Sequence, residues 1–340
     1  MWVVTPGGTL SWMRDLLTIA VHPSQFPDRI RHAILSSLRS RQINPKLHYG
    51  STTQTLRWLA LHETLSPARA EPGCSGMYEA CFDFLVERFS TAHIHVVSLG
   101  CGGGWKEALL LEKLQKTGMD CSYTPVDVST SMVIVARQAA LGAAPQCRCH
   151  PIVADLAEAD DLGPIIGSLE PENTPQLITC FGLLPNFEPH VLGSRLKSLV
   201  RKGDILALSA NLAPGNDYRG GVRSVLGQYD NPPTRDWLAG LLEDLGFTVS
   251  EGALAFRIEE SAEALGLLRI VAELVLNRDC RIEFHSEHFE FEVGACIRTF
   301  FSYRYTPSLV RSFLRISGLD AQESWISPSG EEGAFVAAAC

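Results

Sequence analysis

Five small residues, Gly100-Cys101-Gly102-Gly103-Gly104, follow the apolar run HIHVVSL and directly precede a helical pattern. A strand that turns straight into a helix presents unpaired backbone N–H groups and the positive end of the helix dipole. Glycine lets a ligand approach the backbone closely, because no side chain intervenes. The run therefore predicts a small-ligand site, the alternative being a tight connection without a ligand.

The spacing around this turn excludes two of the three ligand classes that use such geometry. A Walker phosphate loop needs Gly-Lys followed by Ser or Thr, whereas this chain reads GGGWKE. The dinucleotide fingerprint G-x-G-x-x-G would place Trp105 or Glu107 at its third glycine. S-adenosylmethionine (SAM) remains, because class I methyltransferases typically place its methionine carboxylate and ribose against a glycine-rich turn after the first strand.

Two carboxylates follow at the ends of the next two expected strands. Asp127 can accept hydrogen bonds from both ribose hydroxyls, and Asp155 occupies the place where such enzymes often receive the adenine amino group. Ligands of open α/β sheets collect at the carboxyl ends of the strands, where all these residues would lie. The residues predicted to bind SAM are Gly100, Cys101, Gly102, Lys106, Asp127, Val128, Asp155, Leu156, Phe181 and Gly182.

Strand and helix patterns alternate from residue 94 to residue 211, which predicts a Rossmann-like α/β sheet of the class I methyltransferase type, with helices on both faces. The expected strands cover residues 94–100, 122–128, 149–155, 176–182 and 204–211. The expected helices between them lie near residues 105–117, 130–141 and 190–200.

The segments on either side of this alternation predict a second lobe. Helical periodicity is expected over residues 11–45, 52–65, 77–89 and 234–245, and strands over 268–276 and 280–294, the latter alternating like an antiparallel pair with one solvated face. A helix near 307–317 and a strand at 333–340 end the chain. We expect a SAM-binding domain of residues 70–211 and 304–340, and a substrate or lid lobe of residues 1–69 and 212–303.

The composition fits a soluble globular protein, with 46% hydrophobic and 20% charged residues in 340. A net charge of −9 argues against nucleic acid as the main partner. Arg14 and Asp15 interrupt the apolar N-terminal segment, so neither a secretory leader nor a membrane span is expected. The ten scattered cysteines are interpreted as reduced thiols in the cytoplasm, and no metal is expected, since the CRCH cluster at 147–150 has no second ligand pair.

Several longer motifs resemble one family. PKLHYGSTTQTLRWLALHETLSPAR (45–69), CFGLLPNFEP (180–189), GQYDN (227–231), RTFFSYRYTP (298–307) and SWISPSGEEGAF are similar to the histidine Nα-methyltransferases of ergothioneine biosynthesis. The resemblance implies an amino-acid site between two lobes. It implies roles there for Tyr49, for Asn186 at the substrate amine and carboxylate, for Tyr229, and for Ser302 at the imidazole.

The departures from that family concern the acceptor. Phe300 stands where the family has a glutamate that pairs with the imidazole, and Asn211 stands where it has an aspartate. Leu65-Ser66 replaces a pair of tyrosines. A buried imidazole facing Phe300 and Phe301 would lose hydrogen bonds, at a cost of roughly 1–3 kcal/mol. Histidine is therefore not the expected substrate, although both phenylalanines could instead be core residues.

Three functions fit these residues. The preferred one is intramolecular cyclisation of SAM to azetidine-2-carboxylate with release of methylthioadenosine, as in the similar azetidine-2-carboxylate synthases of bacterial secondary metabolism. The alternative is N-methyl transfer to an external small amino acid or amine, and the third is a catalytically silent SAM-binding partner. Trp58 and Ser209 are further candidates, for the aromatic wall and for orienting the amine. The predicted catalytic residues are Tyr49, Asn186, Asn211, Tyr229, Phe300 and Ser302.

Overall fold

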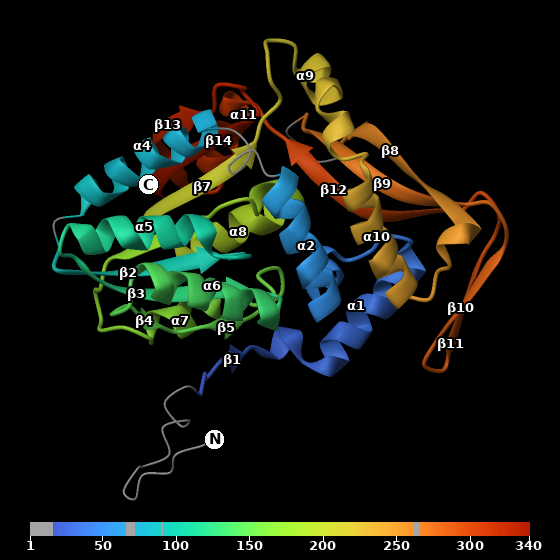
Figure 1. Cartoon of the computed structure of the whole chain (residues 1–340), viewed down its shortest axis with the longest axis horizontal. Helices are drawn as coiled ribbons and strands as arrows, with labels where there is room; N and C mark the ends of the chain where they lie inside the picture. The colour runs from blue at the N-terminus through green and yellow to red at the C-terminus, as the bar shows by residue number, and fades with distance from the viewer. Residues whose placement is uncertain (1–15, 66–71, 90, 262–265) are drawn as a thin grey trace, which may run out of the picture.

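The computed structural model describes residues 16–65, 72–89, 91–261 and 266–340. These residues form one large sheet flanked by helices and, beside it, a smaller sheet with its own helices (Figure 1). No helix of the described chain is long and apolar enough to cross a membrane.

The large sheet has the strand order β1-β5-β3-β2-β6-β7-β14-β13, with β4 also paired to β3. The pairings from β1 to β7 are parallel, and β14 runs antiparallel to both β7 and β13. This order, with an antiparallel hairpin at one edge, confirms the predicted class I methyltransferase sheet. Its strands are β1 (Ala20–Val21), β2 (His93–Leu99), β3 (Asp120–Asp127), β4 (Arg148–Cys149), β5 (Ile152–Val153), β6 (Gln176–Cys180), β7 (Ile205–Asn211), β13 (Leu319–Ile326) and β14 (Glu332–Ala339).

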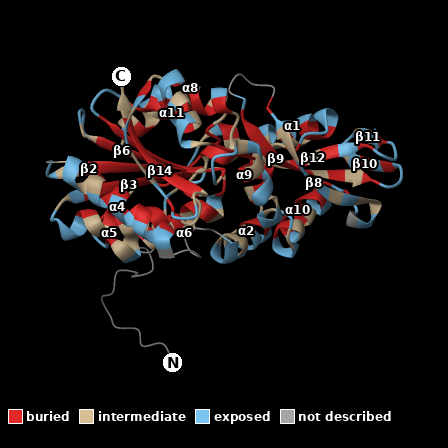
Figure 2. Ribbon diagram, turned by 90° about the horizontal axis from the view of Figure 1, so that it is seen from above, coloured by how far each residue is buried: buried red, intermediate tan, exposed pale blue. Residues whose placement is uncertain are grey.

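Helices cover both faces of this sheet, and the two layers are separated by buried strands (Figure 2). One face packs α4 (Pro72–Arg88), α5 (Trp105–Lys116) and α6 (Thr130–Ala143) around Tyr78 and Leu110. The other packs α7 (Leu162–Gly167), α8 (Pro189–Leu199) and α11 (Pro307–Ile316) around Leu192 and Phe313. Helix α6 begins at a side-chain cap, since the Ser129 hydroxyl accepts the Met132 N–H.

The smaller sheet has the order β12-β9-β8 and is antiparallel throughout. It packs against helices from both the N-terminal part of the chain and the insertion after β7, and the β10–β11 hairpin extends from it (Figure 1). These elements are α1 (Pro27–Ser40), α2 (Thr52–Leu65), α9 (Tyr218–Ser224), α10 (Pro232–Asp244), β8 (Gly252–Glu260), β9 (Leu268–Leu276), β10 (Cys280–Phe284), β11 (Glu287–Phe291) and β12 (Cys296–Arg304).

The structure corrects two sequence predictions. The helix expected over residues 11–45 is wrong for residues 16–26, because Ala20–Val21 forms edge strand β1 and the Ala20 N–H donates to the Pro151 carbonyl. Residues 11–15 lie outside the described residues. The strand expected over 149–155 is two short strands, β4 and β5, since Pro151 has no N–H to donate to the ladder. Strands β8, β12 and β13 were not predicted.

Candidate SAM and acceptor site

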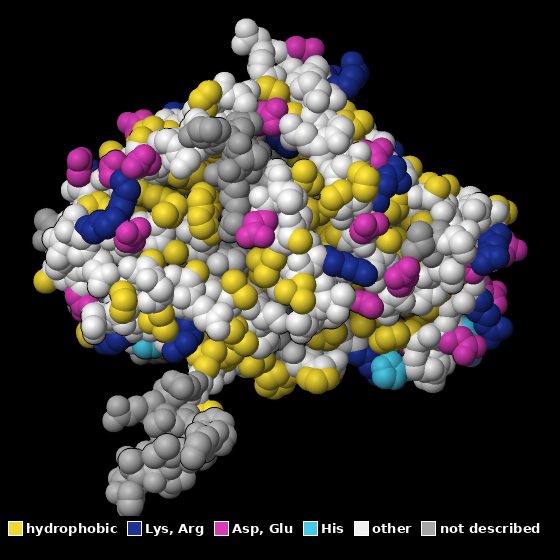
Figure 3. All heavy atoms as spheres, in the orientation of Figure 1, with side chains coloured by type: hydrophobic (Ala, Val, Ile, Leu, Met, Phe, Trp, Pro, Cys, Tyr) yellow, Lys and Arg dark blue, Asp and Glu magenta, His cyan; other side chains and the backbone are white. Residues whose placement is uncertain are grey.

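A cavity of about 720 Å³ lies where the carboxyl end of the large sheet meets α2, α10 and β12. Its size is within the range of roughly 300–1,000 Å³ that is usual for small-molecule sites. The structure brings to this one cavity all sixteen residues that the sequence predicted for SAM binding and catalysis. The face in Figure 3 shows acidic and basic side chains interspersed over the molecule.

The glycine turn closes one end of the cavity and adopts backbone conformations that favour glycine. Gly102 has φ +49° and Gly104 has φ +66°. A Cβ atom on Gly104 would lie 2.6 Å from the Cα atom of Ala136 in α6, so this glycine lets α5 and α6 pack closely. A Cβ on Gly102 would lie 3.2 Å from the Trp58 ring, so α2 closes over the turn.

Asp127 is fixed beside this turn by backbone donors. Its Oδ2 accepts the Gly102 N–H at 3.1 Å and its Oδ1 accepts the Ser129 N–H at 2.9 Å. Burial raises the pKa of the carboxyl to about 6, and the two N–H groups act in the opposite direction. Both oxygens retain capacity to accept further hydrogen bonds, as the ribose hydroxyls of SAM require.

Asp155 is held by an ion pair that the sequence did not predict. Lys46, in the 3₁₀ helix η3 (Pro45–Tyr49), lies with its Nζ 3.0 Å from Asp155 Oδ2 and 2.8 Å from Glu158 Oε1. Its side chain is almost fully buried. Because η3 also carries Tyr49, this ion pair connects the acceptor side of the cavity to the expected adenine end. The only sequence signal for Lys46 is its place in the family-like motif PKLHYG.

Lys106 lines the cavity but already has partners. Its Nζ lies 2.6 Å from the Tyr78 hydroxyl and 3.1 Å from Glu332 Oε1. All three side chains are buried, so the lysine charge is compensated within the protein. The prediction that Lys106 binds SAM therefore rests on its place in the cavity wall and not on a free charge.

Asn211, Tyr229 and Ser302 form a connected network at the other end of the cavity. The Asn211 Nδ2 donates to the Tyr229 hydroxyl at 3.4 Å, and that hydroxyl lies 3.0 Å from Ser302 Oγ. The three residues come from the end of β7, from the turn after the 3₁₀ helix η5 (Leu226–Gln228), and from β12. None of them carries a charge, so the network can orient a neutral polar group.

Aromatic side chains surround this network. The Phe300 ring centroid lies 6.2 Å from that of Tyr229 and 5.8 Å from that of Trp237 in α10. The ring centroids of Tyr49 and Trp58 lie 6.0 Å apart. Burial, and to a lesser extent the nearby negative charge of Asp127, raises the pKa of the Tyr49 hydroxyl above its usual range. Phe300 both lines the cavity and packs in a cluster with Trp237, a residue that the sequence reading missed.

The remaining candidates from the sequence are Asn186, Ser209 and Leu65-Ser66. Asn186 ends the 3₁₀ helix η4 (Leu184–Asn186), lines the cavity, and makes one long contact of 3.5 Å to the Gly182 carbonyl. Ser209, the further candidate for orienting the amine, accepts the Gly182 N–H at 2.9 Å and is not among the residues that line the cavity. Leu65 lines the cavity, whereas Ser66 lies outside the described residues.

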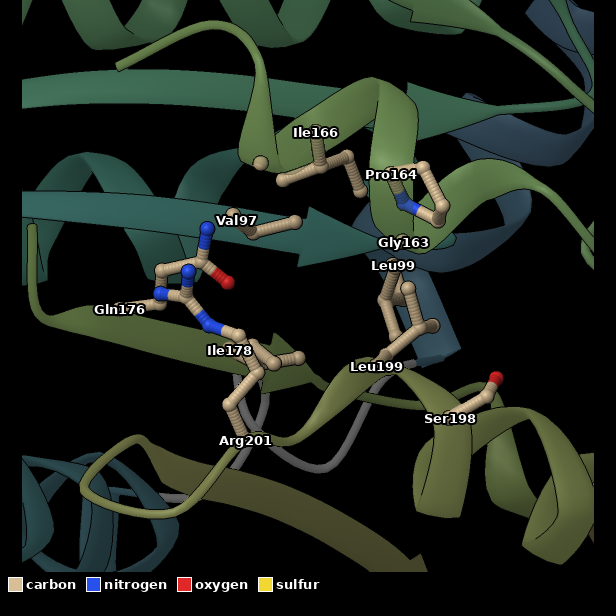
Figure 4. Close-up of a pocket in the computed structure, with 11 residues that line it drawn as sticks. Val97, Leu99, Gly163, Pro164, Ile166, Gln176, Ile178, Ser198, Leu199 and Arg201 are labelled. Carbon is tan, nitrogen blue, oxygen red and sulfur yellow. The ribbon is translucent and has the colours of Figure 1, made fainter. Parts of the chain in front are cut away.

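A second cavity of about 410 Å³ lies between β2, β6, α7 and α8. Figure 4 shows apolar side chains such as Val97 and Ile178 around it, with Gln176 and Arg201 at one side. It contains none of the predicted site residues. Within the described parts of the chain, no group of three or more His, Cys, Asp or Glu residues could hold a metal ion.

Solved structures with a related fold have low sequence identity. Magnesium protoporphyrin IX methyltransferase (ChlM) from Synechocystis PCC 6803, with bound SAH, is 14% identical over 86% of this chain and 97% of its own, with a TM-score of 0.47. The mitomycin 7-O-methyltransferase MmcR is 15% identical over 93% and 70%, with a TM-score of 0.40. The SAM-bound amino pentose methyltransferase CalS10 from Micromonospora echinaspora is 13% identical over 82% and 95%, with a TM-score of 0.37.

The family comparison is more specific. No curated protein sequence significantly matches the chain. Residues 77–230 match the family described as "Histidine-specific methyltransferase, SAM-dependent". The matched segment covers a little under half of the chain and includes the glycine turn, Asp127, Asn186 and Tyr229. It confirms the family resemblance inferred from the motifs: residues 77–230 are similar to the histidine-specific methyltransferases, and the chain is a SAM-dependent transferase.

Proposed function

We propose that this transferase moves the methyl group of SAM to the nitrogen of a small external acceptor. Residues 70–211 and 304–340 would form the SAM-binding domain, and residues 1–69 and 212–303 the lobe that closes over the acceptor. The observation that carries the proposal is the Asn211–Tyr229–Ser302 network. This network and the glycine turn line the same cavity. Asn211, at the end of β7, lies two strands away from β2, the strand that leads into the turn, so the network lies apart from the SAM end.

The SAM end has residues that suit the cosubstrate. The Asp127 carboxylate, held by the Gly102 N–H, provides acceptors at the end of β3, and the glycine turn lets SAM approach the backbone closely at the end of β2. SAM supplies an activated methyl group on a sulfonium cation. The aromatic rings of Tyr49 and Trp58 line the cavity and can stabilise a cation by cation–π contact, while they exclude water.

The acceptor end suits an uncharged amine. The oxygens of Tyr229 and Ser302 can accept N–H hydrogen bonds and so direct the nitrogen lone pair toward the methyl group. A carboxylate close to the amine would favour the ammonium form, which is not nucleophilic. Phe300 and Asn211 stand at the two positions where the family resemblance implied carboxylates, and this favours the neutral amine.

The same uncharged wall supports a second candidate. Phe300 and Trp237 are 5.8 Å apart and leave the network without a charged partner on that side. Such a wall could also lie against the amino group of SAM itself. In that case the methionine part of SAM would bend back so that its own nitrogen closes the azetidine-2-carboxylate ring. The external acceptor is favoured because the network extends the site beyond the glycine turn by two strands of the sheet.

The nucleoside products distinguish these functions. The purified protein is incubated with SAM alone and with SAM plus a panel of small amino acids and amines, and the products are separated by chromatography. Methyl transfer predicts S-adenosylhomocysteine, formed only with an acceptor. Methylthioadenosine from SAM alone would support the cyclisation, and binding of SAM without either product would support the silent partner.

A further inference from the structure

Arg304 lies at the acceptor end of the cavity and had no role in the sequence prediction. It follows Phe300 and Ser302 on β12 at alternate positions, so the three side chains share one face of the strand. All three line the cavity. Arg304 is 4% exposed, which places a guanidinium cation in the interior beside the site.

The partners of this guanidinium are neutral. Its Nη1 donates to the Leu212 carbonyl at 3.0 Å and lies 3.4 Å from the Glu331 carbonyl. Its Nη2 lies 3.5 Å from Gln228 Oε1, and its Nε has no hydrogen-bond partner. None of the carboxylate groups in the described residues forms an ion pair with it. A buried cation without an anion is costly, so buried charges are normally paired.

Arg269, on the neighbouring strand β9, shows the usual arrangement. It is 9% exposed, and its guanidinium nitrogens lie 2.8 Å from Glu188 and 2.6 Å from Glu259. Two carboxylates therefore compensate this buried arginine within the protein. The same sheet thus contains one buried arginine with anionic partners and one, Arg304, whose anionic partner the protein does not supply.

We propose that Arg304 binds the carboxylate of the acceptor, and that the acceptor is an α-amino acid with an apolar side chain. This inference rests on the proposed function and narrows its substrate class. The guanidinium carbon lies 5.3 Å from the Tyr229 ring centroid, and the Tyr229 hydroxyl belongs to the network. A carboxylate at Arg304 therefore places the adjacent amine beside Tyr229 and Ser302.

The side chain of such an amino acid would face Phe300. This residue is two positions before Ser302 on the same strand face and packs against Trp237. β12 thus offers an apolar group, a hydroxyl and a cation in sequence. That order matches the side chain, the amine and the carboxylate of one apolar amino acid. An amine without a carboxylate would leave the buried guanidinium unpaired, which favours the amino acid.

Calorimetry with S-adenosylhomocysteine present tests this without requiring turnover. The probes are L-phenylalanine and L-leucine, each compared with its decarboxylated amine, phenethylamine or 3-methylbutylamine. The wild type is expected to bind at least one amino acid about tenfold or more tightly than its amine. Arg304→Gln should remove that preference. Arg269→Gln should keep the preference while lowering the melting temperature, because it removes the ion pair of Glu188 and one of the ion pairs of Glu259.

A second arm identifies the source of the carboxylate. Arg304→Gln should bind SAM and decarboxylated SAM with wild-type affinities, which also shows that the variant is folded. If the variant loses affinity for SAM but not for decarboxylated SAM, the carboxylate belongs to SAM and the proposal is wrong. Equal binding of amino acids and amines by the wild type, or binding of neither, would also overturn it. Methyl transfer to a simple amine would then leave the proposed function intact.

Discussion

The SAM end of the cavity is defined mainly by backbone groups, whereas the acceptor end is defined by side chains. At the SAM end, the turn after β2 and the N–H groups of Gly102 and Ser129 hold Asp127, so the backbone of neighbouring segments defines the geometry. At the acceptor end, the side chains of Asn211, Tyr229 and Ser302 come from segments far apart in the chain.

This difference separates what is general from what is specific. A backbone site changes only if the turn itself changes, so it suits a cosubstrate that every member of the family binds. A side-chain site changes with a single substitution, as Phe300 illustrates at the position where the resemblance implied glutamate. Substitutions at the SAM end should therefore weaken SAM binding, whereas those at the acceptor end should alter turnover and change SAM affinity little.

The largest effect is expected for Gly102→Val. The position has φ +49°, and a Cβ there would already lie 3.2 Å from the Trp58 ring, so valine should distort the turn. We expect a folded protein with little SAM binding by calorimetry. The matched control is Gly103→Ala, where φ is ordinary and the nearest atom belongs to the flexible Leu59 side chain, at 3.3 Å. A Gly102→Val variant that retains activity would show that the turn is only a connector.

Asp127→Ala should have the next largest effect. Loss of a carboxylate that accepts charge-assisted hydrogen bonds costs roughly 1.5–3 kcal/mol, which corresponds to at least about tenfold weaker SAM binding. The SAM affinity of Asp127→Asn, which retains one acceptor oxygen, should lie between that of Asp127→Ala and that of the wild type. Calorimetric affinity that is the same in all three proteins would remove Asp127 from the site.

At the acceptor end, Phe300→Glu should reduce turnover and leave SAM affinity within about twofold. A carboxylate near the amine favours its protonated form, and the expected loss is about tenfold in kcat at neutral pH. Phe300→Leu keeps the wall apolar and should do less damage, and the wild type should not methylate histidine. If Phe300→Glu weakened SAM binding as strongly as Asp127→Ala, the two ends would not be separable.

The smallest effect concerns pH. Burial raises the pKa of Asp127 from 3.8 to about 6, so this carboxyl favours folding below pH 3.8 and loses that contribution as the pH rises through 6. SAM needs the ionised form, so its affinity should fall several-fold between pH 7 and pH 5. Calorimetry over this range should show that the fall is absent in Asp127→Asn. The same pH dependence in that variant would assign it to another group.

Much of the large sheet was predictable because its signals are local. The apolar runs of β2, β3, β6 and β7 alternate with helical patterns, and a buried parallel strand carries its signal in its own residues. The error at Ala20–Val21 has a different cause, since edge strand β1 exists only through its pairing with β5. The burial of β8 alternates between partly buried and exposed residues, and this weaker pattern was missed.

The same distinction applies to the site. The glycine turn and Asp127 were predictable because strand ends place them together, whatever the rest of the chain does. Tyr49, Asn186 and Tyr229 were proposed only through the family resemblance. Lys46 and Arg304 were missed. The role of Lys46 depends on its contact with Asp155, which lies more than a hundred positions away in the sequence. The role proposed for Arg304 depends on its burial, which the sequence pattern does not show.

The most direct test of the account follows the methyl group itself. The enzyme is incubated with SAM that carries a deuterated S-methyl group and with apolar L-amino acids, and the products are analysed by mass spectrometry. External methyl transfer predicts that the label appears on the amino-acid nitrogen and that the S-adenosylhomocysteine is unlabelled. Label retained in methylthioadenosine, with no labelled amino acid, would contradict the account.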